Sequence, residues 1–209
     1  MKVSVTFLKY KESMKKTIEE LETTDADYIH VDVMDGKFVP PVVVNLHEIN
    51  ELFADTKKPL DVHLMVENPK DYIDIFKGFD NTKIVTVHAE IDNTEDYIDY
   101  IHENDLMAGI AINPETPISS INAFLEKIDY VLIMGVHPGY GGQKMIPETV
   151  DKITELKTLR ETNDYHYLIS LDGGINKETR PLLDGLDVMA VGSFISMSDD
   201  FQKSLNEIR

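Results

Sequence analysis

Two histidines and two aspartates in this sequence have the residue types expected of a divalent metal site. His30 and Asp32 stand two residues apart in the apolar stretch 28–34, His63 stands in the similar stretch 60–66, and Asp172 precedes two glycines. A set of two imidazoles and two carboxylates can bind Zn²⁺, Fe²⁺, Mn²⁺ or Co²⁺. The structural alternative makes each histidine a core residue with one hydrogen bond and each aspartate an isolated cap. A buried carboxylate without a partner is costly, so the four together favour the metal site.

Glycine-rich turns add a second kind of site to this chain. They occur at 138–143, 172–176 and 191–193. Glycine exposes backbone N–H groups, which can bind an anion without a positive side chain. We therefore expect a phosphate group to bind beside the metal.

The elements that must position these residues are apolar, β-branched stretches alternating with segments of helical periodicity. The predicted strands are 3–7, 28–34, 60–66, 83–89, 107–113, 130–136, 168–174 and 188–194. The predicted helices are 12–24, 45–55, 69–78, 94–105, 117–128, 147–163 and 199–209. Strict alternation implies parallel strands joined by right-handed crossovers. Eight repeats in 209 residues favour an α/β fold of the (β/α)8 TIM barrel type, as one domain over 1–209, above an open doubly wound sheet.

Residue parity within the strands predicts which side chains point into the barrel. In 28–34, Ile29, Val31 and Val33 fall on one parity, and the polar residues fall on the other. The active site of such a barrel lies at the C-terminal ends of its strands. The residues that this rule selects are His30, Asp32, Met34, His63, Met65, His88, Met134 and Asp172.

Composition narrows the class of partner. The chain carries 38 Asp plus Glu against 20 Lys plus Arg, a net charge of −18, so we expect neither nucleic acid nor anionic membranes as partners. There is no cysteine, which excludes disulfides and thiolate metal ligands. We find no signal peptide and no apolar stretch long enough to span a bilayer, and we expect a cytoplasmic protein.

Seven longer segments form a specific pattern. They are HVDVMDGKFVP (30–40), DVHLMVENP (61–69), TVHAE (86–90), INPETP (112–117), VLIMGVHPGYGGQKMIPE (131–148), LDGGIN (171–176) and VGSFI (191–195). Together they resemble the ribulose-phosphate 3-epimerase family over nearly the whole chain. The resemblance implies a ribulose-phosphate binding barrel and an isomerase that interconverts D-ribulose 5-phosphate and D-xylulose 5-phosphate in the pentose phosphate pathway. It also implies a homo-oligomer.

The resemblance assigns roles to individual residues. The metal ligands would be His30, Asp32, His63 and Asp172, with zinc expected first and iron, manganese or cobalt as alternatives. Asp32 would be the base and Asp172 the acid in the forward direction. The substrate-binding residues would be Ser4, His63, Met34, Met65, Met134, Gly139, Tyr140, Gly141, Gly142, Gly173, Gly174, Gly192 and Ser193.

The implied chemistry agrees with these residue types. A proton on a carbon next to a ketone is too weakly acidic for a free aspartate, so the cis-enediolate must be stabilised, which a bound metal does as a Lewis acid. Inversion needs one acid–base group on each face of this planar intermediate. The three methionines would shield it from water.

Several positions depart from the family pattern. The stretch 3–8 differs from the usual Pro-Ser-Ile-Leu start, Lys37 stands where histidine is common, 40–45 reads PPVVVN, and Gly135 replaces threonine or serine. These changes spare the ligands and alter the walls of the site. They leave two alternatives open: a 3-epimerase of another ketose phosphate such as D-allulose 6-phosphate, and a sugar-phosphate-binding paralogue without catalysis.

Overall fold

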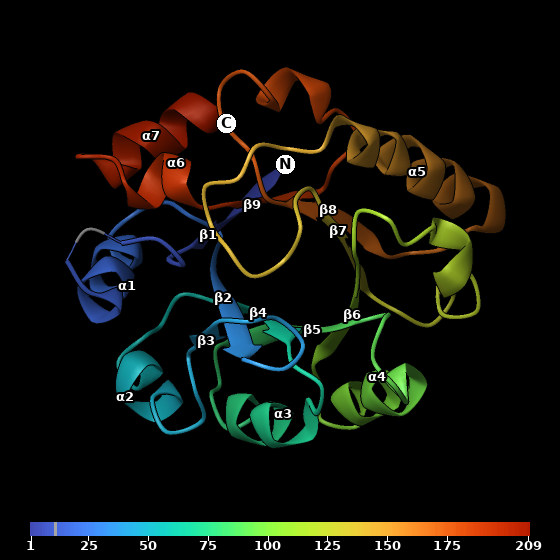
Figure 1. Cartoon of the computed structure of the whole chain (residues 1–209), viewed down its shortest axis with the longest axis horizontal. Helices are drawn as coiled ribbons and strands as arrows, with labels where there is room; N and C mark the ends of the chain where they lie inside the picture. Colours follow the sequence, from blue (N-terminus) through green and yellow to red (C-terminus); the bar gives the residue numbers. More distant parts are fainter. Residues whose placement is uncertain (11) are drawn as a thin grey trace.

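The computed structural model describes residues 1–10 and 12–209. Its strands are β1 (Lys2–Thr6), β2 (Tyr28–Asp35), β3 (Val42–Val43), β4 (Leu60–Met65), β5 (Thr82–His88), β6 (Met107–Ile112), β7 (Tyr130–Met134), β8 (Leu168–Asp172) and β9 (Val188–Val191). All except β3 are parallel to their neighbours, in the order β1-β9-β8-β7-β6-β5-β4-β2. Pairing of β1 with β2, with Ser4 opposite Tyr28, closes the ring. The predicted (β/α)8 barrel is therefore confirmed, and the open sheet is excluded (Figure 1).

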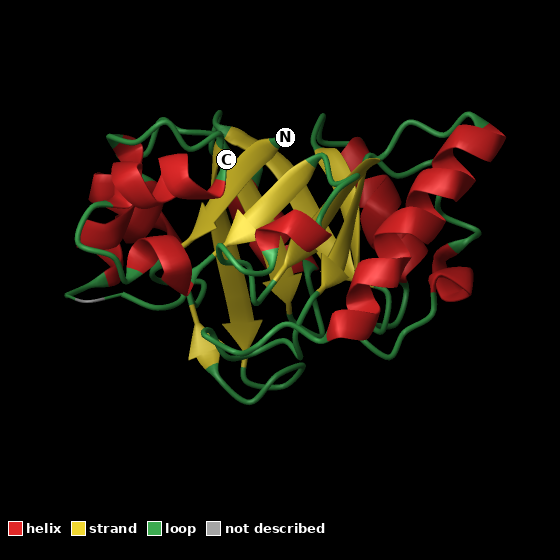
Figure 2. Cartoon of the chain, turned by 90° about the horizontal axis from the view of Figure 1, so that it is seen from above, coloured by secondary structure: helices red, strands yellow, loops and turns green. Residues whose placement is uncertain are grey.

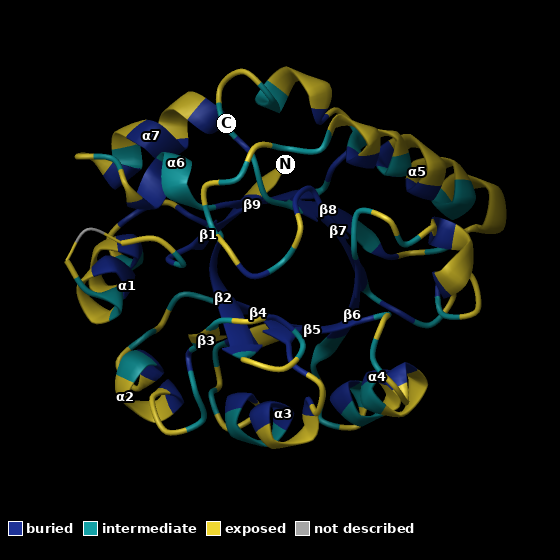
Figure 3. Cartoon of the chain, viewed as in Figure 1, coloured by how far each residue is buried: buried dark blue, intermediate teal, exposed yellow. Residues whose placement is uncertain are grey.

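Helices surround the ring of strands. They are α1 (Met14–Glu22), α2 (Ile49–Phe53), α3 (Lys70–Phe76), α4 (Thr94–His102), α5 (Asp151–Asn163), α6 (Ser193–Ser196) and α7 (Phe201–Ile208). Short 3₁₀ helices lie at η1 (Ile118–Ile121), η2 (Pro147–Val150) and η3 (Arg180–Leu182). Figure 3 shows that the eight parallel strands of the ring are largely buried, whereas β3 is not, and that the helices expose mainly their outer faces.

The segment 117–128 is not the α-helix that its periodicity predicts. It forms η1 followed by turns, with i-to-i+3 bonds such as Ser120 N to Pro117 O and Phe124 N to Ile121 O. The hydroxyl of Ser120 also donates to Pro117 O, at 2.8 Å. Serine, asparagine and β-branched isoleucine favour helices weakly, so local side-chain bonds and burial of the isoleucines prevail over helical continuation.

Residue parity divides the side chains of each strand as predicted. Ile29, Val31 and Val33 pack in the large core between the barrel and its helices. Tyr28 and Met34, on the other parity, belong to separate clusters inside the barrel, together with residues such as Tyr130. The polar residues of β2 therefore share the interior of the barrel with a few apolar side chains.

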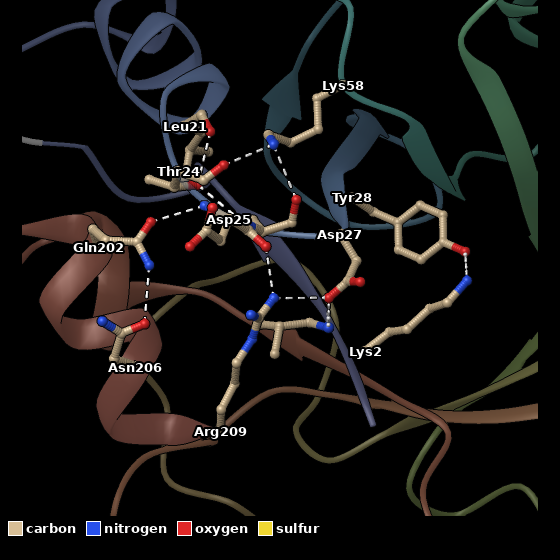
Figure 4. A network of polar contacts seen from close by, with 12 residues as sticks. Lys2, Leu21, Thr24, Asp25, Asp27, Tyr28, Lys58, Gln202, Asn206 and Arg209 are labelled. Atoms are coloured by element: carbon tan, nitrogen blue, oxygen red, sulfur yellow. Dashed lines mark hydrogen bonds and ion pairs between the residues drawn. The ribbon is translucent and has the colours of Figure 1, made fainter.

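The N-terminal ends of the strands are fastened by polar contacts (Figure 4). Arg209 donates to the backbone oxygen of Asp25 at 2.6 Å and to Asp27 Oδ2 at 3.1 Å. The same carboxyl oxygen of Asp27 accepts from the backbone N of Val3 at 2.9 Å. Gln202 of α7 accepts from the backbone N of Asp25 at 2.8 Å. These bonds hold the last helix to the first two strands at the end of the barrel where the strands begin (Figure 2).

Candidate active site

The four predicted metal ligands converge at one point inside the barrel. His30 and Asp32 come from β2, His63 comes from β4, and Asp172 ends β8. Asp32 is paired with His63 in the register of β2 and β4, which makes them neighbours. One ligand atom from each of the four residues lies within 4.8 Å of the other three.

The arrangement of these atoms fits a divalent cation. His30 Nε2 is buried and has no hydrogen-bond partner among the described residues, and it lies 3.5 Å from Asp32 Oδ1. His63 Nδ1 lies 3.2 Å from the same oxygen. Two ring nitrogens thus face one carboxylate, and the fourth ligand completes a two-nitrogen, two-oxygen set that several first-row ions accept.

His30 is fixed from behind by Asp61. Its Nδ1 lies 2.8 Å from Asp61 Oδ2, which leaves Nε2 directed into the cluster. The same oxygen accepts the hydroxyl of Ser4 at 2.8 Å and that of Tyr130 at 3.3 Å. Carboxylates commonly orient histidine ligands in this way. Ser4 lies in this buried layer and is not among the residues that line the cavity, so its substrate contact stays a prediction.

The two aspartates have opposite electrostatic surroundings. Burial opposes the ionisation of Asp32, but the charge of His30 prevails and holds the pKa of Asp32 far below its usual range. Burial, together with the negative charge of Asp32, raises the pKa of Asp172 to about 7. The pair therefore consists of an ionised carboxylate and a carboxyl group that holds a proton near neutrality.

The pKa values of His63 and His30 are also shifted in opposite directions. Burial lowers the pKa of His63 to about 4, although the neighbouring charge of Asp32 acts in the opposite direction. Burial also disfavours the charged form of His30, but the charges of Asp61 and Asp32 outweigh it and raise the pKa of His30 well above 6.5. Before a cation binds, a proton on His30 supplies the positive charge that the carboxylates require.

A cavity of about 340 Å³ opens above this cluster at the C-terminal ends of the strands. Asp32 and Asp172 lie at its floor, and His30 and His63 are buried beneath it. The cavity is also lined by the predicted substrate-binding residues Met34, Met65, Met134, Gly139, Tyr140, Gly141, Gly142, Gly173, Gly174, Gly192 and Ser193. Its volume suits a small metabolite.

Two lysines reach this cavity that the sequence reasoning did not single out. They are Lys9, in the loop after β1, and Lys144, in the loop after β7. The ammonium of Lys9 lies 2.4 Å from the point where a Cβ on Gly142 would stand, so the glycine leaves room for it. Neither lysine has an ion-pair partner among the described residues, so both charges are free to meet an anion.

The hairpin formed by β2 and β3 packs behind the part of the cavity wall that Met34 and Met65 form. Asp35 Oδ1 accepts from the backbone N of Lys37 at 2.8 Å and of Phe38 at 2.9 Å, which fixes the turn. Val39 is buried against Met34 and Met65. Lys37 is exposed and does not line the cavity, and β3 itself was not predicted.

Gly135 brings β7 close to the strand that carries Asp172. Its N–H donates to Asp172 O at 2.7 Å. A Cβ at this position would lie 2.6 Å from Gly173 O and 2.8 Å from Leu171 Cδ2. The glycine that departs from the family pattern is therefore required by the local backbone.

Sequence reasoning missed three polar residues behind the ligands. Asp61 and Thr6 share the inward parity of His63 and Ser4, so the alternation rule could have found both. Thr6 Oγ1 donates to Asp32 Oδ2 at 2.5 Å. Glu90, which contacts His88, follows the end of β5 in a loop, where parity gives no signal.

Comparison with known sequences gives consistent matches. The sequence profile described as the ribulose-phosphate 3 epimerase family matches residues 2–196. A protein from Bacillus subtilis named ribulose-phosphate 3-epimerase is 40% identical over 195 residues, covering 92% of this chain and 90% of the relative. One of the same name from Methanocaldococcus jannaschii is 35% identical over 198 residues, covering 94% and 84%.

Comparison with solved structures supports the fold. A 3-hexulose-6-phosphate synthase from Salmonella typhimurium has a TM-score of 0.70 at 16% identity, covering 100% of this chain and 96% of that one. A protein titled KGPDC from Streptococcus mutans has a TM-score of 0.67 at 12% identity, covering 99% and 96%. Within the described residues, every helix is too short or too polar to cross a bilayer.

Proposed function

This chain belongs to the ribulose-phosphate 3-epimerase family, and from that premise we propose that it interconverts D-ribulose 5-phosphate and D-xylulose 5-phosphate. The observation that carries the proposal is the pairing of Asp32 and Asp172 at the floor of one cavity, within a cluster that fits a divalent cation. Zinc is the expected ion, and iron, manganese or cobalt would satisfy the same ligands.

The two aspartates move the proton. Asp32 is ionised and accepts the C3 proton from one face of the sugar, while Asp172, whose carboxyl group takes up a proton readily, gives one to the other face. In the reverse direction the two exchange roles. Two titratable groups whose pKa values are pushed apart are the usual basis of such an acid–base pair. A divalent cation in the cluster would supply Lewis acidity toward the ketone beside C3.

The walls of the cavity protect the reacting carbon from water. Met34, Met65 and Met134 are almost fully buried, and each contributes to the cavity lining. Thioether side chains are polarisable and hydrate weakly, so they can cover a planar anionic intermediate without offering a proton.

The glycine turns bind the phosphate in this proposal. Residues 139–142, 173–174 and 192–193 line one part of the cavity, where Lys9 also lies. Four of these glycines have positive φ, namely Gly139, Gly142, Gly173 and Gly174, so their backbone follows a path that other residues rarely adopt. Backbone N–H groups and one lysine would offset the repulsion of a phosphate by a chain of net charge −18.

We also propose that the chain acts as one domain over 1–209, as a cytoplasmic homo-oligomer. A single closed sheet that includes every strand of the described residues supports the single domain. Light scattering of the purified protein would test self-association, and a monomeric mass at working concentration would contradict it.

Proton exchange tests the reaction directly. The zinc-loaded protein should exchange the C3 proton of ribulose 5-phosphate with D₂O, and Asp32→Asn and Asp172→Asn should each lose turnover by at least about a thousandfold. Turnover of allulose 6-phosphate, measured in parallel, should be much slower. A large preference for the hexulose phosphate would change the substrate assignment, and absence of exchange by the loaded wild type would reject catalysis on ribulose 5-phosphate.

A further inference from the structure

A buried chain of hydrogen bonds extends from His63 away from the cavity. His63 Nε2 lies 2.9 Å from His88 Nε2, and His88 Nδ1 lies 2.9 Å from Glu90 Oε2. Both imidazoles are fully buried, and the side chain of Glu90 is 23% exposed. The proposed proton transfer uses neither His88 nor Glu90.

The carboxylate at the end of the chain fixes one direction of donation. Glu90 Oε1 accepts from the backbone N of Asn113 at 2.8 Å and from Thr116 Oγ1 at 2.5 Å. Its other oxygen, Oε2, has His88 as its one hydrogen-bond partner in the described part of the chain. An ionised carboxylate can only accept hydrogen bonds, so His88 donates from Nδ1.

Counting protons then determines the state of His63. Three short polar contacts follow one another, and each is a gap that one proton can fill. They join Asp32 to His63, His63 to His88, and His88 to Glu90. Since His88 donates from Nδ1 to Glu90, its Nε2 accepts, and the proton between the two rings is the one on His63 Nε2. The gap at Glu90 has one source of a proton, whereas Asp32 Oδ1 also has His30 Nε2 at 3.5 Å. The unfilled gap is therefore the one between Asp32 and His63.

We propose that His88 and Glu90 are positioning residues that hold His63 as the Nε2-protonated tautomer, with the lone pair of Nδ1 directed at the cation site. This inference rests on the proposed function only in that the site binds a divalent cation. His30 is held by Asp61 through Nδ1 and presents Nε2, so the two histidines present different ring nitrogens to the site.

The outer end of this row of hydrogen bonds, at Glu90, is held in place by contacts outside the barrel. Lys152 of α5 donates to the backbone oxygens of Asn113 and Pro114 at 2.9 Å, and to that of Thr116 at 2.7 Å. These bonds hold the loop whose N–H and hydroxyl groups bind Glu90. The ring of Phe38 lies 4.5 Å from the ring of His88, centroid to centroid. His88 is thus held by its neighbours on several sides.

The tautomer can be measured without any substitution. In a ¹⁵N NMR spectrum of the metal-free protein at neutral pH, His63 should show a protonated Nε2 and an unprotonated Nδ1, and His88 a protonated Nδ1. A His63 protonated on Nδ1 would overturn the inference. If the protein binds no zinc, the proposed function fails, but this spectrum still decides the tautomer.

A substitution tests the positioning role. Glu90→Gln keeps the shape, but either orientation of its amide directs an N–H at a donor, Asn113 N or His88 Nδ1. Zinc affinity, measured by competition with a chelator, should fall by about 10- to 100-fold. Glu95→Gln, which makes the same change of charge at an exposed ion pair with Lys127, should bind zinc as the wild type does. Wild-type affinity in folded Glu90→Gln would contradict the proposal.

Discussion

The hydroxyl of Thr6 lies 2.5 Å from Oδ2 of Asp32, the carboxyl oxygen that does not face the two ligand histidines. Thr6 is on the neighbouring strand β1, where the register places it opposite His30. A hydrogen bond donated to a carboxylate stabilises its ionised form. Thr6 therefore helps to keep the proposed base ready to accept a proton.

Removing this hydroxyl should make Asp32 harder to ionise. Thr6→Val keeps the shape of the side chain and deletes a hydrogen bond to a charged group, which contributes about 1.5–3 kcal/mol. The acidic limb of the profile of kcat/KM against pH should move upward by about one pH unit or more, and Tm should fall by several degrees because the deleted bond also stabilises the fold. Thr17→Val, at a buried threonine of α1 far from the cavity, provides the control. An unshifted limb would show that Thr6 only fills space.

Lys9 should contribute to binding of the phosphate. Lys9→Met keeps the length of the side chain and removes its charge, so KM for the ketose phosphate should rise by roughly tenfold with kcat nearly unchanged. KM changes and kcat does not because a contact to the phosphate stabilises the bound substrate and the transition state of proton transfer by the same amount. Lys83→Met, at the opposite end of the barrel in β5, should leave KM unchanged. Equal KM values for the two variants would contradict a phosphate contact.

Gly135→Ser, which restores a residue common in the family, should damage this protein. The new Cβ would meet the backbone oxygen of Gly173, and relief of this clash must move the strand end that carries Asp172. We expect a loss of about 1–3 kcal/mol in the free energy of unfolding and a fall in kcat of at least about tenfold. Gly78→Ser, after α3, serves as the comparison. Full activity in Gly135→Ser would show that the backbone yields without moving Asp172.

Metal affinity should rise with pH in two stages. A cation needs Asp172 ionised and His30 neutral, and the pKa of Asp172 is about 7 while that of His30 lies well above 6.5. Below about pH 7 zinc displaces both protons, so affinity should rise about 100-fold per pH unit, and above it about tenfold. Chelator competition from about pH 5.5 to about pH 8 measures both slopes. A single slope throughout would show that one of the two groups does not titrate in this range.

The same raised pKa affects the metal-free protein. The folded state binds the Asp172 proton more tightly than the unfolded state, whose pKa is near 3.8. The contribution of this group to stability is therefore complete below about pH 4 and is lost as pH rises through about 7. Bound zinc should reverse the trend, so the increase in Tm on adding zinc should be larger at about pH 8 than at about pH 5.5. Equal increases would contradict the linkage.

The barrel and the cluster of the four proposed ligands could be predicted because both depend on strand periodicity. His30, Asp32 and His63 lie on inward parity in strands whose other parity is almost wholly aliphatic, and each strand is long enough to show the alternation. The shortest elements are too short to show a periodic pattern in the sequence. β3 has two residues, and η3, between β8 and β9, has three, so neither completes a period that a pattern could reveal.

The supporting contacts could be predicted only in part. Asp61 and Thr6 share the parity of the ligands, but parity does not say which ligand atom each one contacts. The link from Glu90 to Asn113 and Thr116 depends on how two loops meet in space, and no local pattern encodes that. The crowding at Gly135 likewise depends on the distance between β7 and the turn after β8.

The two ends of strand β2 have different roles in the structure. Near Tyr28 it belongs to the fastened end of the barrel, and from His30 to Met34 it carries two proposed ligands, one of them the proposed base, and part of the cavity wall. One strand of eight residues therefore spans both the fastened end of the barrel and the proposed site. Exchange of the hairpin loop that follows this strand could redirect specificity within the family without loosening the closure of the barrel.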